Sequence, residues 1–257
     1  MARREGAIPR DPGAADRRSL RLNDPELVRR EYESESGLAA RSAVYQGLWG
    51  GQDARDQAFA AVAEGQPNDV LEVGCGDGTF AARVERELRA HVTALDLSPR
   101  MVELARARGI AASVGDVQDL PFADASFDCA IANWMLYHVP DLNQAFTELA
   151  RVLRRGGRLI ATTTGSNHLG GIWRLFGQDT TIDLPFSSEN GAQLLRAHFA
   201  TVERRRVRSP VQFDDREAVR TYIAATITRK RFAERLPQDL PVPFVAYTDV
   251  AVFVAAK

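Results

Sequence analysis

The sequence has few of the features that place a protein outside the cell or in a membrane. Only two cysteines occur in 257 residues, and Cys75 and Cys129 fall in a glycine-rich segment and an apolar segment, so neither is placed for a disulfide. No apolar run is long enough for a secretory signal or for a bilayer-spanning helix. The sequence therefore predicts a soluble, cytoplasmic protein with no membrane partner.

An excess of charge of one sign is also missing. Lys and Arg number 33 and Asp and Glu 34, which gives a formal net charge of -1. This balance argues against a basic field over the whole molecule that would hold a nucleic acid backbone. Local basic clusters occur at residues 204–208 and 229–231, so a nucleic acid partner is retained as an alternative although none is expected.

The chain divides into four segments by composition and periodicity. Residues 1–24 mix charged residues with Gly, Pro and Ala and predict a disordered tail. Residues 25–68 predict short helices with an apolar side, expected to form an N-terminal helical segment and lid. Residues 69–165 predict a cofactor-binding core, and residues 166–257 a substrate-side insertion followed by the end of the sheet.

Strand and helix periods alternate regularly within the predicted core. Apolar runs at 70–73, 91–97, 112–117, 127–133 and 158–164 predict five strands, and helical patterns lie between several of them, the last at 142–154. Strands that are apolar on both faces are typical of a parallel sheet covered by helices. The predicted fold is α/β, with a doubly wound, mostly parallel sheet, an N-terminal helical extension and a lid insertion after the fifth strand.

The pattern beyond residue 165 is weaker. Helices are expected around residues 192–198 and 217–228, and a strand near 202–207. The alternating run 244–256 is expected to end the sheet.

A glycine-rich loop and a strand-ending acid predict a nucleotide-like ligand. Gly74, Gly76 and Gly78 follow the first strand and allow the backbone to turn sharply and approach a ligand. Asp96 ends the second strand, where a carboxylate can accept hydrogen bonds from both ribose hydroxyls. These features alone fit NAD and other nucleotide-like cofactors, so further positions are needed to identify the ligand.

Five segments, in order, resemble the class I S-adenosylmethionine-dependent methyltransferase family, especially its small-molecule group, similar to ubiquinone-biosynthesis and sugar O-methyltransferases. They are VLEVGCGDG, ALDLSPRM, GDVQDLPFADASFD, ANWMLYHVPD and ELARVLRRGGRLI, and they cover about residues 69–165. Dehydrogenase fingerprints usually place the last glycine one residue further, as G-x-G-x-x-G, and lack the fourth and fifth segments. A nicotinamide oxidoreductase is therefore the less favoured interpretation.

The resemblance implies S-adenosyl-L-methionine as the cofactor and gives each matching residue a role. Glycines 74, 76 and 78 would line its methionine moiety, and Glu72 would steady the loop. Asp96 would bind the ribose, and Asn133 would offer its backbone carbonyl to the methionine ammonium. The adenine would contact Leu97, Met101, Asp116 and Val117, although Met101 equally suits a helix core.

The predicted chemistry requires alignment more than functional groups, because methyl transfer is an in-line displacement at a sulfonium carbon. If the nucleophile is a hydroxyl its proton must leave, and His138 is the candidate base, with a packing role as the alternative. His168 is a second, weaker candidate. We expect no metal in this site.

The expected acceptor is a small organic molecule, methylated on a hydroxyl in biosynthesis or natural-product tailoring. Aromatic residues outside the common core predict an apolar or aromatic acceptor pocket. The substrate-binding candidates are Tyr32, Tyr45, Trp49, Trp134, Tyr137 and Trp173. Arg41 is expected either to reach the cofactor carboxylate or to form a surface salt bridge.

Other functions share the same core. Methylation of nitrogen or carbon in a small molecule is one alternative, and a non-catalytic cofactor-binding module is another. A nucleic-acid methyltransferase is less favoured, because Asn133-Trp134-Met135 replaces the Pro-Pro-aromatic segment usual in enzymes that methylate base amino groups.

Overall fold

The computed structural model describes residues 22–32, 35–177, 184–225 and 229–257. Most of the predicted tail, residues 1–21, therefore lies outside the described residues, as do residues 226–228 of the helix expected at 217–228. Among the described residues, no helix combines the length and apolar character needed to cross a bilayer.

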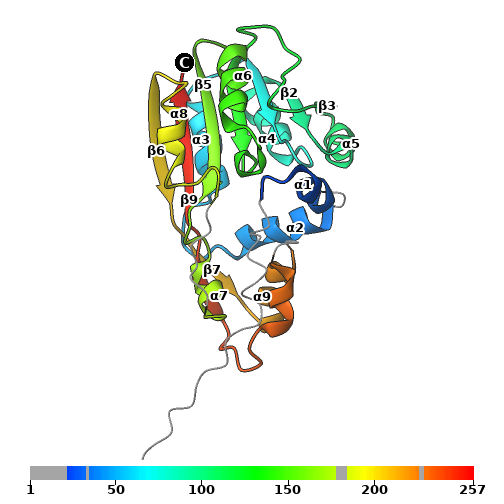
Figure 1. Ribbon diagram of the computed structural model, residues 1–257, viewed down its shortest axis with the longest axis vertical. Coiled ribbons are helices and arrows are strands. Elements are labelled where there is room, and N and C mark those ends of the chain that lie inside the picture. The colour runs from blue at the N-terminus through cyan, green and yellow to red at the C-terminus, as the bar shows by residue number, and fades with distance from the viewer. Residues whose placement is uncertain (1–21, 33–34, 178–183, 226–228) are drawn as a thin grey trace, which may run out of the picture.

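A seven-stranded sheet forms the centre of the protein (Figure 1). Five neighbouring strands are parallel, and the sixth, β9, runs antiparallel to its neighbours on both sides. The spatial order is β3 (Ala111–Val114), β2 (His91–Asp96), β1 (Asp69–Val73), β4 (Phe127–Asn133), β5 (Leu153–Thr164), β9 (Val250–Ala256) and β6 (Thr201–Val207). The predicted doubly wound α/β fold is confirmed.

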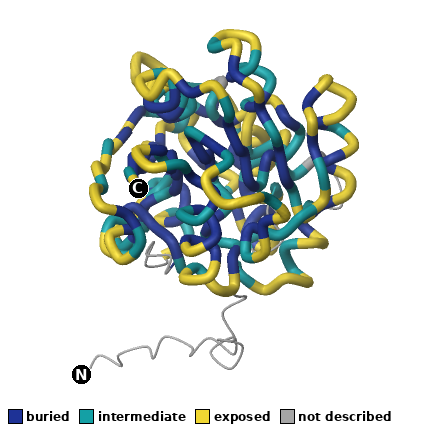
Figure 2. The backbone as a smooth tube through the Cα atoms, turned by 90° about the horizontal axis from the view of Figure 1, so that it is seen from above, coloured by how far each residue is buried: buried dark blue, intermediate teal, exposed yellow. Residues whose placement is uncertain are grey.

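Helices cover both faces of the sheet because its strands are apolar on both faces. Leu71 faces a core shared with α6 (Leu142–Val152) and α8 (Gly191–Leu195). Its neighbour Val70 faces the opposite core, against α3 (Ala54–Ala63), α4 (Thr79–Leu88) and α5 (Pro99–Ala107). Figure 2 shows these buried segments in the interior, with exposed backbone around them. The alternation of side chains along each strand thus produces the three layers.

A smaller apolar cluster lies beyond one end of the sheet (Figure 1). Its elements are α7 (Gly170–Arg174), α9 (Arg216–Ala224), the 3-10 helix η4 (Lys230–Arg235) and a two-stranded sheet of β7 (Pro210–Phe213) and β8 (Phe244–Tyr247). The N-terminal elements α1 (Pro25–Glu31), α2 (Glu35–Ala43) and the 3-10 helix η2 (Val44–Gly47) precede the core, as predicted, and α2 contacts α9. The C-terminus lies at the far end, because Ala256 pairs with Arg158 near the amino-terminal part of β5.

The prediction that residues 244–256 form one run ending the sheet was wrong. The run divides at Thr248 and Asp249: β8 pairs with β7, and only β9 joins the main sheet, between β5 and β6. Both polar side chains are buried and satisfied, Thr248 by the backbone N–H of Ser209 and Asp249 by the guanidinium of Arg206. Buried polar groups require such partners, and these partners fix the break in the strand.

Strand ends also differ from the prediction. β3 ends at Val114 instead of residue 117, so Asp116 lies in the following loop. β5 begins at Leu153 instead of residue 158, and α6 therefore ends at Val152 instead of residue 154.

Candidate functional site

A cavity of about 2500 Å³ lies at the carboxyl ends of β1, β2 and β4. These ends contribute Glu72, Asp96 and Asn133, and α1, α2 and the insertion after β5 supply further lining. Ligands of open parallel sheets bind at this edge, outside the carboxyl ends of the strands. The cavity is therefore the candidate site.

The glycine loop after β1 forms one wall of the cavity. Gly74 and Gly76 have φ angles of +65° and +55°, in the left-handed region that favours glycine. A Cβ on Gly74 would lie 2.7 Å from the side chain of Met135, another residue of the wall. Met135 therefore fills the space that a side chain on Gly74 would need, and residue 74 borders the cavity with its backbone alone.

Gly78 allows two helices to pack closely and does not form part of the cavity wall. It does not line the cavity, and a Cβ there would lie 2.8 Å from the Cβ of Ala105 in α5. Its φ of +78° turns the chain into α4 while α4 and α5 pack closely. The contact of Gly78 with a cofactor is therefore not supported by its position.

Asp96 is held rigidly at the end of β2. Its Oδ2 accepts a hydrogen bond from the backbone N–H of Gly76 at 2.9 Å, and its Oδ1 accepts from the N–H of Ser98 at 2.8 Å. Burial raises the pKa of this carboxyl, while the backbone donors oppose the rise. Each oxygen retains a lone pair, so the carboxylate can still accept two hydrogen bonds from a ligand.

Glu72 is a buried acid whose partners are incomplete. It is 2% exposed, and among the described residues its Oε2 has no hydrogen-bond partner. Burial, with a contribution from the nearby charge of Asp96, raises its pKa to about 8. A buried polar atom without a partner is costly, which indicates that a ligand or water completes this environment.

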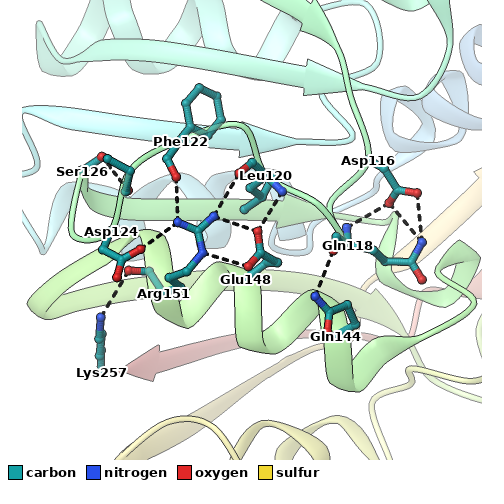
Figure 3. A network of polar contacts seen from close by, with 11 residues as sticks. Asp116, Gln118, Leu120, Phe122, Asp124, Ser126, Gln144, Glu148, Arg151 and Lys257 are labelled. Atoms are coloured by element: carbon teal, nitrogen blue, oxygen red, sulfur yellow. Dashed lines mark hydrogen bonds and ion pairs between the residues drawn. The ribbon is translucent and has the colours of Figure 1, made fainter.

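Asp116 lines the cavity from the loop after β3, and Figure 3 shows its contacts with Gln118. Its carboxylate accepts hydrogen bonds from the backbone N–H and the side-chain amide of Gln118. Farther along, Arg151 of α6 donates to the carbonyls of Leu120 and Phe122 and pairs with Glu148. This network anchors the loop that presents Asp116.

The residues predicted to contact adenine separate into two groups. Leu97 and Val117 line the cavity beside the ends of β2 and β3. Met101 does not, because its side chain is fully buried in the protein. Its position supports the alternative role in the core.

His138 lies in the cavity wall, in the 3-10 helix η3 (Leu136–His138) after β4. Its Nδ1 is 2.8 Å from the carbonyl oxygen of Leu22, and its Nε2 is 3.2 Å from the Tyr32 hydroxyl. The carbonyl can only accept, so Nδ1 carries the proton and the Nε2 lone pair accepts from Tyr32. Burial lowers the pKa of His138 to about 4, so the ring is neutral at physiological pH.

The predicted substrate aromatics are only partly brought together. Tyr32, Tyr45, Trp134 and Tyr137 line the cavity, and the rings of Tyr45 and Trp134 are 5.8 Å apart. Trp49 is outside the cavity and 68% exposed, so its predicted role has no support in the geometry.

Trp173 is buried below the wall instead of lining it. The guanidinium of Arg229 covers its ring, and that guanidinium lines the cavity in its place.

Arg41 and Arg229 are two of the arginines that line the cavity, and neither side chain is fully exposed. Arg41 forms an ion pair with Glu31 that is largely buried rather than on the surface. Arg229 belongs to the basic cluster at residues 229–231, which the sequence offers as a nucleic-acid surface, but it lines this cavity. The positive charge of Arg229 can be read from the sequence. The orientation of its side chain toward the cavity could not be predicted, because it depends on the packing of distant segments.

The other basic cluster is engaged within the protein. Arg205 pairs with Glu64, Arg206 pairs with Asp249, and Arg204 donates to the carbonyl of Ser188. These contacts weaken the case for a nucleic acid surface at residues 204–206.

Comparisons with known proteins agree with the fold. Residues 71–161 match the family model of a methyltransferase domain. A malonyl-[acyl-carrier protein] O-methyltransferase of Herminiimonas arsenicoxydans is 37% identical over 177 residues, 65% of this chain and 66% of that protein. The O-methyltransferase cnsE of Penicillium expansum is 37% identical over 111 residues, 40% of each chain. This chain thus spans about two thirds or less of the length of these curated relatives.

A solved structure extends the similarity over most of the chain. A SAM-dependent methyltransferase from Thermotoga maritima, described as a possible histamine N-methyltransferase, superposes with a TM-score of 0.55 at 21% identity. The match covers 89% of this chain and 99% of that one, and at this identity it shows the fold alone. The family model and the sequence relatives show that the chain belongs to the class I S-adenosylmethionine-dependent methyltransferase family.

Proposed function

We propose that this protein transfers a methyl group from S-adenosylmethionine to an oxygen atom of a small organic acceptor in biosynthesis. One observation carries the proposal: a single cavity holds Glu72, the glycine loop and Asp96 on one side and His138 on another. The names of the two sequence relatives, both O-methyltransferases, support oxygen as the methylated atom.

The residues present fit this cofactor. The unpartnered Oε2 of Glu72 is available to a donor, Gly74 and Gly76 line the cavity with backbone alone, and Asp96 has lone pairs for two hydroxyls. Asp116, Leu97 and Val117 supply the expected adenine end, and Asn133 the expected ammonium contact. When bound, the cofactor supplies an electrophilic methyl group on a sulfonium.

The tasks left to the protein are orientation and exclusion of water. We assign residues 69–165 to cofactor binding, residues 25–68 to covering the cavity and residues 166–257 to the acceptor side. Leu38 of α2 supports the covering role, because it lies 3.2 Å from the position of a Cβ on Gly76.

Calorimetric titration with S-adenosylhomocysteine, with NAD as the control, tests the proposal. The expected result is micromolar binding of S-adenosylhomocysteine and no measurable binding of NAD. Tighter binding of NAD, or no binding of S-adenosylhomocysteine to folded protein, would contradict the assignment.

His138 is proposed to accept the proton of the acceptor hydroxyl at Nε2, where the Tyr32 hydroxyl lies in this structure. His138→Phe keeps an aromatic ring beside Tyr32 and Tyr137 but removes the base, so kcat should fall about 10²- to 10⁴-fold with S-adenosylhomocysteine affinity unchanged. Because its pKa is about 4, His138 should impose no change in the parent rate between pH 5 and 8. Steady-state rates followed by mass spectrometry measure both effects.

His198→Phe is the matched control, because His198 also has a ring hydrogen bond, between its Nε2 and the side-chain oxygen of Asn143, but lies outside the cavity. Its rate should equal that of the parent. Parent-like turnover of His138→Phe would instead show that His138 is a packing residue and that alignment alone drives transfer.

A further inference from the structure

Arg229 is a half-buried cation with no ion-pair partner among the residues that the structure describes. Its guanidinium carbon lies 4.1 Å from the centroid of the Trp173 ring, and the side chain lines the cavity. Among the described residues, none forms an ion pair with this guanidinium or accepts a hydrogen bond from it. Burial lowers its pKa, which expresses the cost of holding the charge there.

The surrounding groups do not neutralise this charge. Glu31 is the nearby acid, and it is already paired with Arg41. Tyr222 and Tyr137 have raised pKa values because of burial, and His168 has its pKa lowered to about 4, so all three are uncharged at neutral pH.

The guanidinium groups of Arg41 and Arg229 therefore share one carboxylate, that of Glu31, at the end of the cavity that these residues line. Arg41 also donates from Nη1 to the carbonyl of Ala225, while its Nη2 is buried without a partner in the described part of the chain. One positive charge and several N–H donors are left for a ligand.

We propose that this end of the cavity binds a carboxylate group of the methyl acceptor, with Arg229 as its partner. The proposal rests on the proposed function and specifies its acceptor as an aromatic or apolar carboxylic acid. The guanidinium lies over the Trp173 ring, its N–H groups have no partner among the described residues, and the edge of a guanidinium matches a carboxylate with two parallel hydrogen bonds. Tyr137 and Tyr222 supply the apolar and aromatic surface around it.

The acceptor is favoured over the cofactor as the source of this carboxylate. His168 and Trp173 lie between β5 and β6, and Arg229 lies between β7 and β8, whereas the groups that fit the cofactor lie between Glu72 and Asn133. The anion site and the cofactor wall are thus built from different parts of the chain.

Calorimetry of the S-adenosylhomocysteine-bound protein with benzoate and benzamide tests the proposal, because the two probes share a shape and differ in charge. The parent should bind benzoate at least about 10-fold more tightly than benzamide. Arg229→Gln should reduce that preference to less than about 3-fold. Arg235→Gln removes a cation that also lies over an aromatic ring, Phe232, but is exposed and outside the cavity, and it should keep the parental preference.

Three results separate the possible failures. Absence of S-adenosylhomocysteine binding by the parent contradicts the proposed function itself. Binding of S-adenosylhomocysteine with no preference for benzoate, or a preference that survives Arg229→Gln, overturns only the carboxylate site. If Arg229→Gln weakens S-adenosylhomocysteine but not 5′-methylthioadenosine, which lacks the amino-acid moiety, Arg229 binds the cofactor carboxylate and the proposal is also overturned.

Thermal unfolding distinguishes a binding role from a structural one. Desolvation of the unpaired charge opposes folding and the contact with Trp173 favours it, so Arg229→Gln without ligand should unfold no more than about 2 °C below the parent. Arg229→Lys keeps the charge but not the planar fork, and it should restore part of the benzoate preference. A large loss of melting temperature in both variants would show that Arg229 supports the fold instead.

Discussion

Asp96→Ala should weaken the binding of S-adenosylhomocysteine by at least about 100-fold. Two hydrogen bonds from ribose hydroxyls to a carboxylate are worth about 1.5 to 3 kcal/mol each, and about 3 kcal/mol corresponds to roughly a 100-fold change in Kd. The rigid placement of Asp96 by the N–H groups of Gly76 and Ser98 adds to the effect, because the carboxylate is already oriented before the ligand arrives. Calorimetric titration measures the change.

Asp128→Ala is the matched control for this variant. Asp128 also accepts two backbone N–H bonds, from Asn68 and Asp69, but it lies outside the cavity. Its loss should lower stability and leave the Kd for S-adenosylhomocysteine unchanged. Parental affinity in folded Asp96→Ala would remove the ribose role from Asp96.

The ligand-free parent should lose stability as the pH rises from about 5 to 8, and Glu72→Gln should remove most of this loss. The pKa of Glu72 is about 8 in the folded protein and 4.5 in its ordinary state. Between these values the folded protein retains a proton that the unfolded chain has lost, so raising the pH favours unfolding. The difference between the two pKa values corresponds to a decrease of up to about 5 kcal/mol in the free energy of unfolding, and this decrease is complete above pH 8.

Urea unfolding of ligand-free protein at several pH values measures this effect. Glutamine cannot ionise, so the variant should be the more stable protein above pH 8. Glu148→Gln is a control of opposite sign, because Arg151 lowers the pKa of Glu148 and the ionised form is the stabilising one (Figure 3). Equal pH dependence in Glu72→Gln and the parent would show that the Glu72 carboxyl ionises as it does in water.

The order of strands and helices could be predicted because it depends on local properties. The predicted strand at 127–133 matches β4, whose side chains are mostly apolar and buried. The α5 helix begins at Pro99, as predicted, because Ser98 caps it by accepting a hydrogen bond from the N–H of Met101. Glycines after a strand and an acid at the end of the next strand likewise identify a ligand-binding edge from local chemistry.

Contacts between distant segments decided the rest of the site. The sequence gives Gly78 and Met101 the residue types expected at a cofactor, but packing against α5 in one case and burial in the core in the other place both outside the cavity. Arg229 has the appearance of a surface charge in the sequence, and only the position of Trp173 and the helices around it turns it into the cavity. Local sequence thus determined the cofactor-binding edge, whereas the acceptor end was decided by tertiary structure, because its charges come from segments that meet only on folding.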